Sequence, residues 1–243
     1  MNSIEPKPRA CPTIGWHTGL SMPLRRRTVG FVLACSLFVG CAGYRGGWES
    51  VAYIGDAPPA ASGEPLALDQ VRKLGELSVS GLKLRVTIDN QLRTYDTQVY
   101  LFILPLSVDP RSVYAKNNQP GKTRVYVTVI PQVRGFLFRP SAATLRVADR
   151  HFTGSAGFEF GMWDEDWRRV ERGGKWEHRP IGADLALSEV GRQYLLSIDF
   201  LTPVPSPESR DIVLDLSHSL ISTTEPRLPP IKFAPVRWKE GYT

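Results

Sequence analysis

The feature that most constrains this chain is an alternation of apolar and polar residues with a period of two. Residues Leu82–Ile88 and 125–129 show it most clearly, with leucine, valine or isoleucine at every second position. Successive side chains of a β-strand point to opposite faces of the sheet, so this period indicates strands with one buried face. No long stretch repeats its apolar residues every 3.6 positions, as an amphipathic helix does. The sequence therefore predicts an all-β protein.

Turn-forming residues separate about nine or ten short segments of this kind. Many short strands with regular turn signals are typical of a single antiparallel β-sandwich, and we expect that domain to span residues 71–243. The expected strands are 77–79, Leu82–Ile88, 95–103, 125–129, Phe136–Phe138, Thr144–Val147, 157–161, Tyr194–Phe200, 212–216 and 231–238.

Three local features refine this prediction. The alternation changes phase at Ser80-Gly81, which we interpret as a β-bulge. Residues 100–104 are apolar at every position, which is typical of a covered central strand. Arg172-Gly173-Gly174 predicts a tight turn, and therefore a hairpin between residues 167–171 and 175–178.

Residues 22–40 have the organisation of a secretory signal. Three arginines at 25–27 follow Met22, and twelve mostly apolar residues then lead to Cys41. The apolar stretch is well below the ~20 residues that a membrane-spanning helix needs. Counting from Met22 gives a compact signal, so we interpret residues 1–21 as an upstream extension.

The end of this segment, Leu37-Phe38-Val39-Gly40-Cys41, resembles the lipobox of bacterial envelope lipoproteins. In that family the cysteine thiol receives a diacylglyceryl group, the peptide is cut before the cysteine, and the new amine is acylated. The resemblance implies a membrane partner, through acyl chains on Cys41. Ala42 stands where aspartate commonly retains such proteins in the inner membrane of Gram-negative cells, so in such a host the resemblance implies the outer membrane of the cell envelope. Secretion without a lipid anchor is the alternative.

The strand pattern is similar to that of the immunoglobulin-like sandwich lipoproteins of bacterial envelopes. The similarity is one of pattern, because the Cys…Trp…Cys framework of true immunoglobulin domains is absent. Residues 41–70 are rich in glycine, alanine and proline, so we expect a lipid anchor followed by a flexible tether. A partner-binding segment around Trp48 and Tyr53 is the alternative for this stretch. Helices are expected only as single turns, beginning at Asp109-Pro110 and within 188–192.

The charge of the whole chain is dominated by the signal. The formal net charge is +6, but 25 of the 30 basic residues and 23 of the 24 acidic residues follow Gly40, which leaves +2. This balance gives no support for nucleic-acid binding, which needs a clustered positive surface. Cys11 and Cys35 precede the cut, so a disulfide scaffold and a cysteine-rich zinc site are excluded. Lipidation accounts for the remaining thiol, Cys41.

The signatures of common enzymes are missing after Cys41. We find no Gly-x-Ser-x-Gly, His-Glu-x-x-His or phosphate-loop motif. The histidines His151, His178 and His218 are isolated in the sequence. We therefore expect no catalytic residue, no cofactor and no metal.

The densest polar cluster is Trp163-Asp164-Glu165-Asp166-Trp167, with Trp176 downstream. Tryptophan rings beside carboxylates can stack on a sugar ring and accept hydrogen bonds from its hydroxyls. The candidate ligand-binding residues are Trp163, Asp164, Asp166, Trp167 and Trp176. Calcium binding is a weaker interpretation, because the spacing of a calcium loop is absent. A third interpretation of this cluster is a polar turn before a hairpin, with the tryptophans at the edge of the core and the charges solvated or paired with Arg168 and Arg169.

Together these features predict a lipid-anchored envelope protein with a non-enzymatic binding or structural domain. Its expected partner is an envelope protein or a glycan. The alternative is a secreted glycan- or ligand-binding module that uses its exposed tryptophans.

Overall fold

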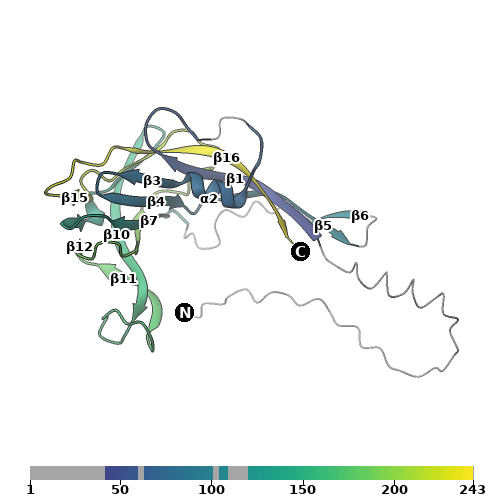
Figure 1. Ribbon diagram of the computed structural model, residues 1–243. Coiled ribbons are helices and arrows are strands. Elements are labelled where there is room, and N and C mark those ends of the chain that lie inside the picture. Colours follow the sequence, from purple (N-terminus) through teal and green to yellow (C-terminus); the bar gives the residue numbers. More distant parts are fainter. Residues whose placement is uncertain (1–41, 60–62, 101–103, 109–119, 243) are drawn as a thin grey trace, which may run out of the picture. The chain divides into compact units, whose positions relative to one another are not determined.

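The computed structural model describes residues 42–59, 63–100, 104–108 and 120–242 (Figure 1). They belong to one unit, which extends from Cys41 to Thr243. The described residues are mostly β-structure, which confirms the predicted all-β class. Thirteen of their strands form one strongly curled, almost entirely antiparallel sheet, and three more form a small second sheet.

The described elements are, in chain order, β1 (Ala42–Tyr53), β2 (Leu66–Ala67), α2 (Leu68–Leu74), β3 (Glu76–Val79), β4 (Leu82–Ile88), β5 (Leu92–Tyr100), β6 (Leu104–Val108), β7 (Thr123–Pro131), β8 (Phe136–Phe138), the 3₁₀ turn η1 (Pro140–Ala142), β9 (Thr144–Val147), β10 (Arg150–Trp163), β11 (Lys175–Ile181), β12 (Leu185–Leu187), β13 (Tyr194–Phe200), β14 (Ile212–Asp215), β15 (Leu220–Ser222) and β16 (Ile231–Tyr242).

The long strand β10 connects the two parts of the large sheet. The sheet runs β3-β4-β7-β13-β10-β9-β14-β16-β1-β5-β6, with β11 added beside β10 and β2 beside β16. The first residues of β10 pair with β9, whereas its later residues pair with β13 on one edge and β11 on the other. The register shifts between Gly154 and Ala156, and such an irregularity bends a strand and increases its twist. One strand therefore belongs to both halves of the sheet.

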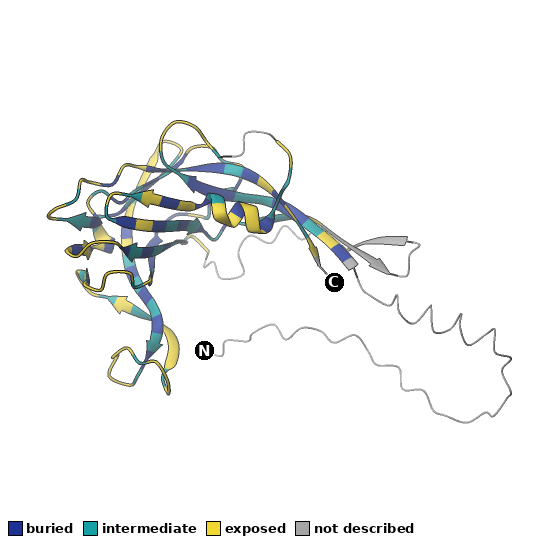
Figure 2. Ribbon diagram, viewed as in Figure 1, coloured by how far each residue is buried: buried dark blue, intermediate teal, exposed yellow. Residues whose placement is uncertain are grey.

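The core lies on the face of the sheet where the predicted alternation places apolar side chains. Val125, Val127 and Val129 are fully buried, and their neighbours along β7 are not (Figure 2). Phe138 and Leu220 of the small sheet belong to the same buried cluster. The alternation predicted for β7 is confirmed, and the two sheets share one core.

The prediction of a flexible tether at 41–70 is wrong for its first half. Residues Ala42–Tyr53 form β1, which pairs with β16 on one edge and β5 on the other. A Cβ atom at Gly46 would lie 2.5 Å from Tyr95 Oη, and one at Gly47 would lie 1.7 Å from the Leu92 carbonyl oxygen. Gly46 and Gly47 therefore allow neighbouring strands to approach closely. The folded body begins near residue 42, not 71.

The one α-helix of the described residues, α2, begins within the last three residues of the expected tether and continues to Leu74. Leu68 and Val71 are buried against β1 and β16 in a small cluster that includes Trp238. The side chain of Gln70 accepts a hydrogen bond of 3.1 Å from the backbone N–H of Ala67 and so caps the helix start. The spacing of Leu68, Val71 and Leu74 was the signal for this helix, but seven residues are too few to show a clear period.

Three local predictions are corrected. Ser80-Gly81 is the two-residue turn of the β3–β4 hairpin, with Gly81 at φ 70°, and the phase changes because the chain reverses. Tyr100 ends β5 and pairs with Leu104, the first residue of β6 at the end of the sheet, so these two residues do not belong to one central strand. The hairpin partner of β11 is β10, not residues 167–171.

The remaining local predictions divide into two groups. The strands at Phe136–Phe138, Thr144–Val147 and Tyr194–Phe200 are confirmed with their predicted bounds. Residues 188–192 form a turn without a helix. The expected signal, Cys41 and the helical turn at Asp109-Pro110 lie outside the described residues.

Candidate functional site

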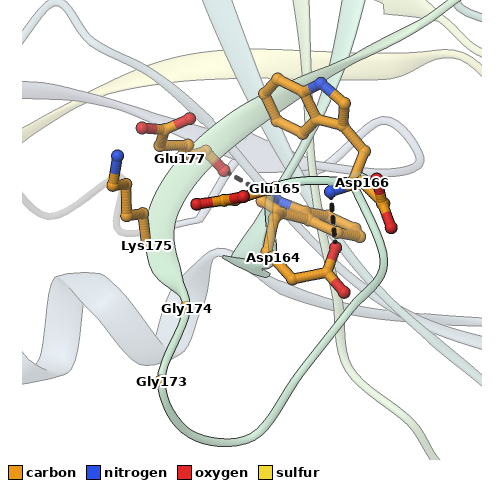
Figure 3. A pocket seen from close by; sticks show the side chains of 9 residues that line it. Asp164, Glu165, Asp166, Gly173, Gly174, Lys175 and Glu177 are labelled. Atoms are coloured by element: carbon orange, nitrogen blue, oxygen red, sulfur yellow. Dashed lines mark hydrogen bonds between the residues drawn. The ribbon is translucent and has the colours of Figure 1, made fainter.

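The candidate site is a hollow at the end of the β10–β11 hairpin, with a cavity volume of about 550 Å³. It brings together four of the five predicted ligand-binding residues. Figure 3 shows the acidic loop on one side and the strand that carries Lys175 and Glu177 on the other. The lining residues are Trp163, Asp164, Glu165, Asp166, Trp167, Gly173, Gly174, Lys175 and Glu177.

Trp163, the last residue of β10, is a fixed wall of the hollow. Its side chain is almost fully buried, and its indole Nε1 donates a hydrogen bond of 3.0 Å to the carbonyl oxygen of Glu177. The guanidinium carbon of Arg179 lies 4.3 Å from the centroid of the indole ring, within the range of a cation–π contact. These contacts hold the ring in one orientation.

The carboxylate of Asp164 organises the loop that follows. Its Oδ1 atom accepts hydrogen bonds from the backbone N–H groups of Asp166, at 3.0 Å, and Arg168, at 2.7 Å. Its own backbone N–H donates to the carbonyl oxygen of Arg168 at 3.0 Å. A carboxylate that satisfies two backbone donors in this way stabilises a tight turn. The structure therefore assigns Asp164 a positioning role more readily than a contact with ligand.

Trp167 is presented by this loop in an unusual conformation. Its backbone has φ 59°, in the left-handed region, which costs a non-glycine residue about 1–2 kcal/mol. The side chain is 42% exposed, and its ring lies 6.5 Å from that of Trp163 at an angle of 56°. Strained backbone conformations cluster at binding sites, where the surrounding structure enforces them. Trp167 is therefore the strongest single indication of a ligand site.

The acidic side chains of the hollow are accessible to water. Glu165 and Asp166 are exposed, and the carboxylate of Asp166 lies 3.8 Å from the guanidinium of Arg168, which is also exposed. Within the described part of the chain, no three His, Cys, Asp or Glu side chains gather closely enough to hold a metal ion. The arrangement offers hydrogen-bond acceptors beside two aromatic rings.

Trp176 is the predicted ligand residue that the structure separates from the others. Alternation along β11 sends Lys175 and Glu177 into the hollow and Trp176 to the opposite face. There the ring of Trp176 stacks on Phe160 with a centroid distance of 5.4 Å and an angle of 26°. The prediction that Trp176 shares a site with Trp163 and Trp167 is wrong.

Lys175 and Glu177 are lining residues that the sequence analysis missed. Their position follows from the register of the hairpin, in which Lys175 pairs with Trp163 and Glu177 with Gly161. The Gly173-Gly174 turn was the available signal, because a hairpin closed there on β10 places both side chains beside Trp163. Because residues 167–171 were predicted to pair with residues 175–178, the position of Lys175 and Glu177 beside Trp163 was not predicted.

The three histidines among the described residues do not line the hollow. His151 and His218 are exposed, and His178 is partly buried on the same face of β11 as Trp176. Burial, and to a smaller extent the positive charge of Arg124, lowers the pKa of His178 below its ordinary value. Its imidazole lies 4.8 Å from the Phe160 ring, centroid to centroid, in an aromatic cluster.

Comparison with known proteins finds no family model, no curated protein and no solved structure that matches this chain. No helix of the described residues combines the length and the hydropathy that crossing a membrane requires.

Proposed function

We propose that this protein is a non-enzymatic envelope lipoprotein whose β domain binds a glycan in the hollow beside Trp163 and Trp167. The observation that carries the binding role is Trp167, a half-exposed aromatic ring held over the hollow at φ 59°. A loop whose only task was to connect two strands would gain stability from glycine or asparagine at that position.

A glycan fits the chemistry of the hollow better than an apolar ligand. A sugar ring has an apolar face that stacks on indole and an edge of hydroxyl groups that donate hydrogen bonds. Glu165, Asp166 and Glu177 supply carboxylate acceptors around the ring of Trp167, and Lys175 supplies a donor. A few polar groups around aromatic walls are typical of small-molecule sites.

The anchor rests on the resemblance of residues 37–41 to a lipobox. We propose that Cys41 carries two or three acyl chains, because one chain gives only marginal membrane binding. Ala42 favours the outer membrane over the inner membrane. We further propose that the two sheets form the two layers of a sandwich, since Phe138 and Leu220 of the small sheet pack in the same core as Val127.

The binding role is tested by titrating the full chain with an N-acetylglucosamine trimer and with neutral hexose trimers, followed by tryptophan fluorescence. We expect saturable binding to one of these sugars, and Trp167→Ala should weaken it about tenfold, as the loss of an aromatic contact does. Trp176→Ala is the matched control, because its ring is exposed on the other face. Absence of binding to every sugar, or equal losses in both variants, contradicts the proposal.

The anchor is tested separately by mass spectrometry of the mature N-terminal peptide. We expect a lipidated Cys41 at the new N-terminus, and detergent-phase partitioning that Cys41→Ala abolishes. An unmodified peptide that reads through Gly40 into Cys41 would exclude the anchor. A soluble, unmodified chain that still binds sugar would instead support the secreted module.

A further inference from the structure

Three arginines converge on one buried carboxylate next to the hollow. Glu159 of β10 is 1% exposed and faces the core side of the sheet. Its Oε2 accepts a hydrogen bond of 2.7 Å from Arg179 of β11, and its Oε1 accepts one of 3.0 Å from Arg169. The guanidinium of Arg192, from the turn before β13, lies 3.5 Å from Oε1.

This cluster holds more positive charge than its buried acid requires. Asp199, which is equally buried, has both of its oxygens bound by the guanidinium of Arg124, at 2.6 and 2.9 Å, and the ammonium of Lys122 lies 3.5 Å from one of them. One bidentate arginine with a more distant lysine therefore accompanies this buried carboxylate. Glu159 instead has three arginines. The exposed Glu189 pairs with Arg192, and even with its charge included the five side chains carry a net charge of +1.

The arginines also keep donors available. A guanidinium has five N–H donors, and the hydrogen bonds of Arg169 and Arg179 to Glu159 occupy one donor of each, while the Nε atom of Arg179 is buried with no hydrogen-bond partner among the described residues. The side chains of Arg169, Arg179 and Arg192 are 34%, 29% and 25% exposed, so a small solute can reach them.

Aromatic rings fix two of these guanidinium groups in place. Arg179 lies over Trp163, and Arg192 lies over Tyr194 at 4.5 Å from the ring centroid. Stacked arginines lose little further freedom when they bind a planar or tetrahedral anion. The cluster is therefore both charged and preorganised.

We propose that Arg169, Arg179 and Arg192 bind an oxyanion, the carboxylate or phosphate group of a ligand, and that Glu159 holds the three guanidinium groups together. This site and the glycan hollow share Trp163 as a wall, but the proposal does not depend on glycan binding. The residues come from β11 and from two separate turns, and the folded sheet brings them together.

The test is the thermal unfolding of the full chain while inorganic phosphate replaces chloride at constant ionic strength. We expect a saturable rise in Tm, about 3–6 °C at ten times Kd. Arg169→Gln and Arg192→Gln should each abolish this rise. Arg168→Gln is the matched control. Arg168 is next to Arg169 in the chain, but its side chain is 78% exposed, and the ion pair described for it is with Asp166, at 3.8 Å. A second titration with citrate separates a carboxylate site from a phosphate site.

Each outcome decides the proposal. A rise with one anion that is lost in the two cluster variants and kept in Arg168→Gln supports it and identifies the ligand group. No rise with either anion, or equal rises in all variants, overturns it in favour of a purely structural ion cluster. If one cluster variant fails to fold, the other gives the same test. Trp167→Ala should keep the phosphate response, so failure of the glycan proposal and failure of this one are distinguishable.

Discussion

Replacing Trp167 by glycine and by alanine tests the conformation of the loop that builds the hollow. At an ordinary position, alanine is the more stable of the two by about 0.5–1 kcal/mol, because glycine has more conformational freedom to lose. At φ 59° the order should reverse, since alanine keeps a left-handed cost of about 1–2 kcal/mol that glycine avoids. We expect Trp167→Gly to be more stable than Trp167→Ala by about 0.5–1 kcal/mol.

The second expected quantity is the difference in the free energy of unfolding between each variant and the unmodified protein. Both variants lose the contact between Trp167 and Trp163, which has a centroid distance of 6.5 Å and is worth about 0.5–1.5 kcal/mol. Trp167→Ala should therefore be destabilised by about 1 kcal/mol, while Trp167→Gly should have nearly the stability of the unmodified chain. Both should lose glycan binding equally, because both lack the indole ring.

Urea unfolding followed by circular dichroism measures these differences. With a slope of about 2 kcal/mol/M, the two variants should differ in midpoint by roughly 0.3–0.5 M. The same pair at Trp176 is the control: this residue lies in β11 with no left-handed backbone, so alanine should be the more stable substitution there. If alanine is also the more stable residue at 167, the loop does not hold Trp167 in the left-handed region and the argument for a strained site fails.

Four further outcomes can be measured on the same protein. Deleting residues 42–53 should abolish cooperative thermal unfolding by circular dichroism, because β1 pairs with both β16 and β5. Val127→Asp should prevent folding at 25 °C, since an unpaired carboxylate at a fully buried site costs several kcal/mol; the chain would show no urea transition. Burial raises the pKa of Glu49, so its charged form opposes folding. Glu49→Gln should then unfold at higher urea than the unmodified chain at pH 7, and this difference should vanish below about pH 4.5, where the carboxyl is protonated in both states. Burial lowers the pKa of His178, so the unfolded chain binds the proton first and stability should fall as the pH decreases below about 6.5. His178→Gln should lose less stability between pH 7 and pH 5, and equal losses in both proteins would contradict the assignment.

The strands that the sequence predicted best are those whose burial alternates strictly. β7 alternates between buried and partly exposed residues along its whole length, so its period of two is visible without any tertiary information. β1 could not be predicted this way, because Gly46 and Gly47 have no side chain to show a pattern. Close approach to Tyr95 and Leu92 explains these glycines, and both residues are distant in the sequence.

The residues of the candidate site also divide into those that a local sequence pattern predicts and those whose position depends on strand pairing. Trp163, Asp164, Asp166 and Trp167 gather because they are nearly contiguous in the chain, so a local pattern was enough to predict them. The exclusion of Trp176 depends on the pairing of Lys175 with Trp163, which is a property of the hairpin register. The arginines around Glu159 come from separate turns and strands, and no spacing in the sequence predicts that they meet.

Because β1 begins at Ala42, it limits the distance that the domain could move away from an acylated Cys41. A flexible tether over residues 42–70, which the sequence predicts, would have an r.m.s. end-to-end distance of about 30 Å and would let the body tumble freely above a bilayer. Ala42, the next residue, is already in register with Val99, and Gly43 is in register with Tyr242. An anchored molecule would therefore stand directly on the lipid surface with little freedom to turn, and its height above the bilayer would be set by the sheet itself. Any partner would have to meet the domain at the membrane.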